Sequence, residues 1–104
     1  MPYESNWSVT AAGTNSGATA TLAADSTRQW IVTGIAGHTD TDSTIQITDG
    51  TNVLFESKID VSVSGIDFIF SNIVIPVGTG NAAKGIVTSS SSDCQVTIWG
   101  SSAP

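Results

Sequence analysis

The only histidine of the chain lies in a short polar segment that could bind a cation. His38, Asp40 and Asp42 alternate with threonines, so an imidazole and two carboxylates lie close together in sequence. Calcium needs about six to eight oxygen ligands, and zinc would need two further ligands from elsewhere. A polar connection between two strands explains the same residues without a metal. We therefore assume no cofactor and leave open whether His38, Asp40 and Asp42 hold an ion.

Residues suited to catalysis are few. Serine and threonine are frequent, but His38 is the sole imidazole and no residue order resembles a catalytic triad. We expect Glu56, Asp60 and Asp67 near strand ends, where surface solubility explains them better than paired acid–base chemistry. Cys94, the only cysteine, lies in an apolar run that favours a buried thiol. These patterns predict that the protein is not an enzyme.

The tryptophans offer another kind of chemistry, because aromatic rings can stack on sugars. Trp7, Trp30 and Trp99 could form the platform of a carbohydrate-binding module, or they could fill and cap a core. Tyr3 and Trp7 lie in a stretch too short to bury them, and both residue types are favoured in protein interfaces. We predict that Tyr3 and Trp7 contact a neighbouring subunit or partner, and keep sugar binding by the three tryptophans as the alternative.

The elements that must position these residues are short strands. Turn residues recur between runs of β-branched and aromatic residues with a period of two, and Asp49-Gly50 is a strong hairpin signal. No stretch shows helical periodicity over ten or more residues. About eight strands predict an all-β fold, a two-layer antiparallel β-sandwich of jelly-roll-like topology. The side chains expected in its core are Ile31, Ile35, Ile45, Ile47, Val53, Phe68, Val96 and Ile98.

The length of 104 residues allows one domain. We expect an N-terminal arm over residues 1–6, the sandwich over residues 7–100 and a C-terminal tail over residues 101–104. The formal net charge is −6, and three Lys and Arg residues are too few to bind nucleic acid directly or to dock on anionic lipid. No apolar run approaches the roughly 20 residues of a membrane span, and the N-terminus lacks a secretory pattern, so we expect synthesis in the cytoplasm.

Four segments carry a distinctive order of turns and strands. They are AAGTNSGATATLAADSTRQWIVTGIAG, IQITDGTNVLF, NIVIPVGTGNAAKGIVTSSSS and the ending CQVTIWG. In this order the chain, from Trp7 to Gly100, resembles small β-sandwich virion proteins of tailed bacteriophages. That group includes capsid decoration (cement) proteins and head or tail accessory proteins. The resemblance carries over no individual functional residue.

The resemblance implies a non-enzymatic structural protein that binds the outer capsid surface and stabilises contacts between capsid subunits. Its partners would be the major capsid protein and further copies of itself in a symmetric homo-oligomer, with a trimer as the first expectation. It would be assembled in the host cytoplasm and located on the virion. The alternatives are a phage head-fibre or tail accessory protein and, from another class, a carbohydrate-binding module.

Overall fold

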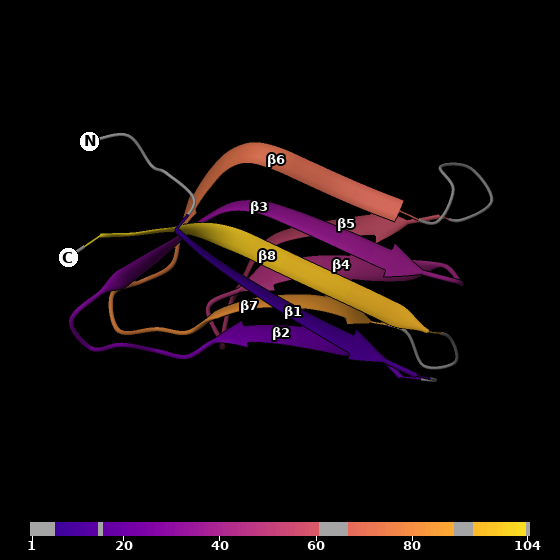
Figure 1. Ribbon diagram of the computed structural model, residues 1–104, viewed down its shortest axis with the longest axis horizontal. Coiled ribbons are helices and arrows are strands. Elements are labelled where there is room, and N and C mark those ends of the chain that lie inside the picture. Colours follow the sequence, from indigo (N-terminus) through magenta and orange to yellow (C-terminus); the bar gives the residue numbers. More distant parts are fainter. Residues whose placement is uncertain (1–5, 15, 61–66, 89–92, 104) are drawn as a thin grey trace.

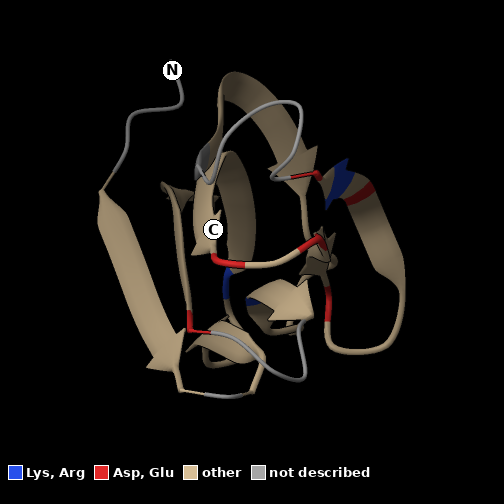
Figure 2. Cartoon of the chain, turned by 90° about the vertical axis from the view of Figure 1, so that its right-hand side faces the viewer, with Lys and Arg blue, Asp and Glu red and all other residues tan. Residues whose placement is uncertain are grey.

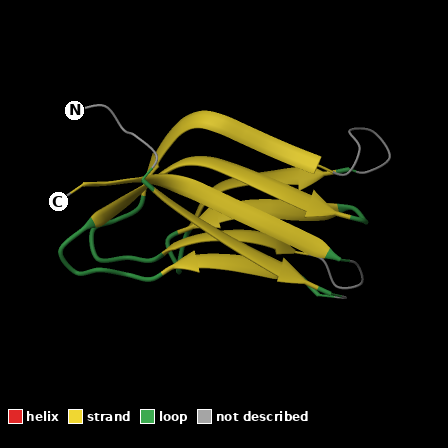
Figure 3. Cartoon of the chain, in the orientation of Figure 1, coloured by secondary structure: helices red, strands yellow, loops and turns green. Residues whose placement is uncertain are grey.

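The computed structural model of the protein describes residues 6–14, 16–60, 67–88 and 93–103. Over these residues the chain forms eight strands in two stacked layers, and no helix (Figures 1 and 3). The strands are β1 (Trp7–Gly13), β2 (Ala18–Leu22), β3 (Gln29–Thr39), β4 (Ser43–Thr48), β5 (Val53–Ile59), β6 (Asp67–Pro76), β7 (Ala83–Thr88) and β8 (Cys94–Ala103). The predicted all-β sandwich is confirmed.

The strand order identifies the topology. Sheet A has the order β1-β8-β3-β6 and sheet B the order β2-β7-β4-β5, and every pairing is antiparallel. The chain crosses between the sheets after most strands, so that sequence neighbours lie in different layers. Two four-stranded sheets wound in this way form a jelly roll. Strands β5 and β6 are the edge strands on one side of the sandwich, and β1 and β2 are the edge strands on the other.

The core lies between the sheets and follows the period of two along each strand. In β2, Ala18 and Ala20 are buried while Thr19 and Thr21 face outward. Isoleucine and valine fill most of the interior, because β-branched side chains pack well on a pleated surface. The fully buried aliphatic side chains are Ile35, Ile45, Ile47, Ile59, Ile98, Val32, Val77, Val87 and Val96.

Most of the predicted core residues are buried, with two qualifications. Ile31 is buried but lies outside the main core cluster, and Phe68 is half-buried against that cluster. The prediction for Val53 was wrong, because its side chain is 53% exposed. Val53 follows the β4–β5 turn directly, and a register shift at Thr48 places it at the free end of its strand.

Strand β6 joins two apolar runs of the sequence. The runs end at Phe70 and at Pro76, and the strand continues through Asn72 between them. Asn72 has a φ of 59°, in the left-handed region that asparagine tolerates better than most residues. The register with β3 shifts at this point. The two runs therefore continue along the same edge of sheet A.

The end of the sandwich also differs from the expected boundary. Strand β8 runs to Ala103, and Ser101 and Ala103 pair with Ile31 and Gln29 of β3. The expected tail over residues 101–104 is thus largely the last part of a strand. Position 104 and the expected arm, apart from Asn6, lie outside the described residues.

Candidate functional site

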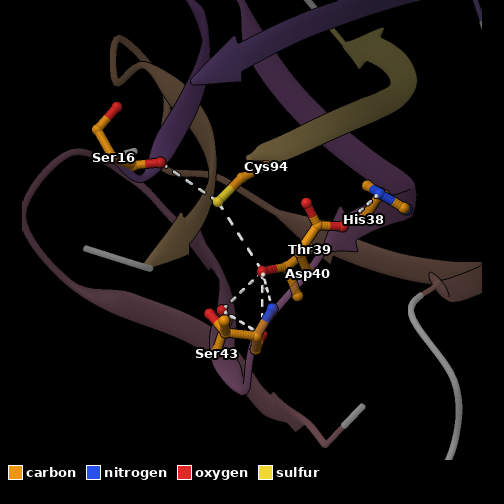
Figure 4. Close-up of polar contacts among 7 residues, drawn as sticks. Ser16, His38, Thr39, Asp40, Ser43 and Cys94 are labelled. Carbon is orange, nitrogen blue, oxygen red and sulfur yellow. Dashed lines mark hydrogen bonds and ion pairs between the residues drawn. The ribbon is translucent and has the colours of Figure 1, made fainter. Parts of the chain in front are cut away.

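The candidate cation ligands lie at the end of the sandwich where β3 connects to β4. His38 Nε2 is 3.5 Å from Asp40 Oδ1, and both side chains are partly exposed. The buried Thr39 lies between them in sequence, and its Oγ1 is 3.0 Å from Ser43 Oγ (Figure 4). The described residues contain no group of three or more His, Cys, Asp or Glu side chains that could hold a metal. The structure therefore brings His38 and Asp40 together, but Asp42 does not complete a site with them.

Cys94 lies beside this connection and is buried, as predicted. Its Sγ donates to the carbonyl oxygen of Ser16, 3.3 Å away, and is 4.0 Å from Thr39 Oγ1 (Figure 4). The thiol therefore joins the β1–β2 connection to the end of β3. Its contacts are those of a structural side chain that closes one end of the core.

The three tryptophans do not share a surface. Trp7 and Trp30 pack against the core and meet edge to face, with ring centroids 6.3 Å apart. Their indole Nε1 atoms donate to the backbone carbonyls of Ser101 (2.8 Å) and Ala23 (3.0 Å). Trp99 alternates with the buried Ile98 along β8 and lies over Gly34, on the opposite, outer face of sheet A. Because the rings are divided between two faces, they form no common platform for a sugar.

Trp7 therefore has partners within its own chain, and the loss of its side chain is expected to weaken the fold itself. Tyr3, the other residue predicted to contact a partner, lies outside the described residues.

Exposed large apolar side chains lie instead along β5 and β6, and they were not predicted from the sequence. Ile69 is 71% exposed, the highest value among these side chains. The two strands meet where Phe55 stacks on Phe70, with ring centroids 5.2 Å apart. We call this surface the apolar edge. Its residues are Val53, Leu54, Ile69, Phe70 and Val74.

A signal for the apolar edge was present in the sequence of β6. The segments Phe68-Ile69-Phe70 and Ile73-Val74-Ile75 are apolar at consecutive positions, whereas a strand covered on one face alternates. Consecutive apolar residues place hydrophobic side chains on both faces of the strand. Such a pattern also fits a central strand that is buried on both faces. It predicts an exposed apolar surface only if the strand lies at the edge of a sheet, and that depends on the tertiary fold.

Charged residues are distributed unevenly over the molecule. The four strands of sheet A contain one Asp, Glu, Lys or Arg residue, Asp67. Glu56, Lys58 and Lys84 lie on strands of sheet B. Several aspartates gather in the connections at the end that Figure 2 faces, which we call the acidic end. Its described residues are Asp40, Asp42, Asp60 and Asp93.

The opposite end has its own acids, which are committed to turns. Asp49 Oδ1 accepts hydrogen bonds from the backbone N–H groups of Thr51 and Asn52, at 2.9 and 2.6 Å. These bonds, led by that from Asn52, hold the pKa of Asp49 below its ordinary value. Hydrogen bonds from Thr27 similarly lower the pKa of Asp25. These carboxylates therefore stabilise local turns at this end.

No protein-family model matches the sequence, and no curated protein is significantly similar to it. In the described part of the chain, no helix has the length and hydropathy to span a bilayer. The surfaces described above are thus the basis for a functional proposal.

Proposed function

We propose that this chain is a non-enzymatic structural protein of a bacteriophage virion, a capsid decoration protein that binds the outer capsid surface and stabilises contacts between capsid subunits. The observation that carries the proposal is the apolar edge. Five large apolar side chains are exposed on two neighbouring edge strands, and exposed apolar side chains in such numbers are typical of protein contacts. The resemblance of the sequence to such virion proteins supports the same reading, and jelly rolls are common among viral capsid domains.

The backbone of β6 adds to the case for a protein partner. Within the described residues β6 pairs with β3 alone, so its other side presents unpaired peptide groups. Natural proteins shield such edges with lysine, proline or bulges. Here the bulge at Asn72 and the terminal Pro76 interrupt only the second half, and the stretch from Phe68 to Ser71 has no charged residue. A neighbouring protein would cover this edge in the assembled particle.

The acidic end supplies the second element of the proposal. Aspartates from separate connections give this end of the molecule a negative surface potential. Such a surface attracts a basic partner. In a symmetric homo-oligomer with its axis along the strands, a trimer in our proposal, every copy would present this end on the same side. The major capsid protein is the proposed partner of that combined surface.

Capsids assembled without this protein provide the test. The purified chain should co-sediment with them, and Leu54→Asp combined with Val74→Asp should weaken that binding by roughly tenfold or more. The matched control is Thr19→Asp with Thr21→Asp on β2, the edge strand on the other side of sheet B. Failure of the wild-type chain to bind capsids, or its absence from purified virions by mass spectrometry, contradicts the proposed function. Unchanged binding by the β5–β6 variant excludes the apolar edge as the contact.

A further inference from the structure

The outer face of sheet A differs from the rest of this acidic molecule because it has almost no charge. Strands β1 and β8 contain no Asp, Glu, Lys or Arg residue, β3 contributes only His38 as a titratable group, and Asp67 stands at the first position of β6. Thr10 and Thr97 meet on this face, with their hydroxyl oxygens 2.8 Å apart. The outer face of sheet B, by contrast, presents Lys84 among its small polar residues.

A hollow of about 260 Å³ lies on this face. Its floor is Ala36 on the central strand β3, whose register partners are Ile69 of β6 on one side and Thr97 of β8 on the other. Partners in register point to the same face, so the small alanine lies between two larger side chains. Gln95 and His38 continue the rim. The hollow therefore follows directly from a small residue at the centre of the sheet.

An apolar side chain also projects from this face beside the hollow. Ile69 borders the hollow and is 71% exposed, more than any other large apolar side chain described. A projection and a hollow on one face can satisfy each other only across two molecules, since Ile69 itself forms the wall of its own hollow. Filling the hollow would restore the dispersion contacts that its lining now lacks.

We propose that the outer face of sheet A is a contact between copies of this chain, in which Ile69 of one copy enters the hollow over Ala36 of the next. This inference rests on the part of the proposed function in which copies assemble with one another. Two chains of net charge −6 repel each other, so they associate most readily through a face without charge. A basic partner would be drawn to the acidic end instead.

Disulfide trapping tests this contact. The test variant carries Ile69→Cys and Thr97→Cys in one chain. Positions 69 and 97 lie on the strands to either side of Ala36, so their Cα atoms are about 9.6 Å apart, two strand spacings. A disulfide needs Cα atoms within about 7 Å, so it can form only between chains. Thr19→Cys with Gln46→Cys is the matched control, because these residues flank Ile86 in the same way on sheet B. We expect covalent oligomers from the sheet A pair under mild oxidation, and only monomer from the control.

Sedimentation of non-covalent variants gives an independent readout. Ile69→Arg should raise the dissociation constant of the oligomer by roughly tenfold or more, whereas Thr19→Arg should leave it unchanged. Both positions are exposed, so circular dichroism should report an intact sandwich for each variant. A wild-type chain that sediments as a monomer at the highest attainable concentration overturns the inference, as does equal trapping of both cysteine pairs.

The outcomes also separate this inference from the proposed function. If the sheet A cysteine pair forms covalent oligomers but the chain does not bind capsids, the contact between copies is supported and capsid decoration is contradicted. A monomeric chain that binds capsids overturns the contact and supports decoration.

Discussion

Gly34 and Trp99 depend on each other on the outer face of sheet A. The two residues are register partners, and a Cβ atom at position 34 would overlap the indole ring of Trp99. The ring can therefore lie flat across β3 only because residue 34 has no side chain. This close approach of a ring to a backbone is a reason for glycine within a central strand, where it otherwise weakens the sheet.

We expect Gly34→Ala to lower the free energy of unfolding by about 1–3 kcal/mol, because the added methyl group displaces the indole. Urea unfolding monitored by fluorescence measures the change. In the Trp99→Leu background the same substitution should cost less, since a leucine side chain can move aside. Strictly additive costs would show that the ring is not what excludes the methyl group.

The charge of Asp49 is tied directly to the β4–β5 turn. Its folded-state pKa is lowered by the backbone hydrogen bonds of the β4–β5 turn, so its stabilising effect is present above the ordinary value of 3.8. That effect is lost as the pH falls below 3.8 and through the folded-state pKa. We expect Asp49→Ala to lower the urea midpoint at neutral pH, with the difference from wild type shrinking in acid. A difference that is constant with pH would mean that the carboxylate charge is not involved.

At the scale of elements, a strand could be predicted wherever one of its faces packs on the core and the other faces solvent. In β2, alanine and threonine alternate, and in β4 Ile45 and Ile47 alternate with polar residues, so the period of two is plain. The last part of β8 could not be predicted in this way. Ser102 and Ala103 have no apolar pattern, and backbone pairing with β3 holds them in the sheet.

The candidate surfaces were harder to predict than the strands. Residue type alone makes Trp7 and Trp30 candidates for binding, yet their position on the inner side of sheet A depends on the strand order. Ile69 was overlooked for the opposite reason, since an isoleucine in a strand is normally buried. Which strands form the edges is decided by the winding of the whole chain.

The pairing of β8 with β3 leads to a prediction about truncation. Removing residues 101–104 deletes the last three register pairs and the Ser101 carbonyl that accepts the Trp7 indole N–H. We expect the truncated chain to unfold at clearly lower urea concentration, with a loss of about 2 kcal/mol or more from hydrogen bonds and packing. Removing residue 104 alone is the control. Equal midpoints for both chains would mean that this segment behaves as the tail that we first expected.

At the scale of the molecule, charge is separated from the surfaces proposed for contact between copies. Aspartates collect at the acidic end, lysines lie on sheet B, and sheet A is nearly uncharged. The arrangement lets the chain remain strongly acidic while one face can approach another copy. Repulsion between acidic ends limits such assemblies unless a basic surface compensates it.

The acidic end should govern the rate of capsid binding if the proposed function holds. We expect Asp40→Asn, Asp42→Asn and Asp93→Asn together to slow association with capsids and to reduce its dependence on salt, with little change in stability. Stopped-flow or surface-based binding at several ionic strengths measures this. Glu56→Gln, on strand β5, is the control and should have little effect. A salt dependence unchanged by the triple substitution would show that the acidic end does not face the capsid.

The antiparallel pairing of β1 with β8 has a practical consequence for attaching other polypeptides. The backbone N–H of Asn6 donates to the carbonyl oxygen of Gly100 at 2.6 Å, so the first and last strands begin and end side by side. The start of β1 and the end of β8 lie at the end of the sandwich opposite the acidic end (Figure 1). If that end rests on a capsid, a peptide or enzyme fused before β1 or after β8 would project outward from the particle. The fold would then serve as a display scaffold that carries cargo at either terminus without obstructing its own attachment.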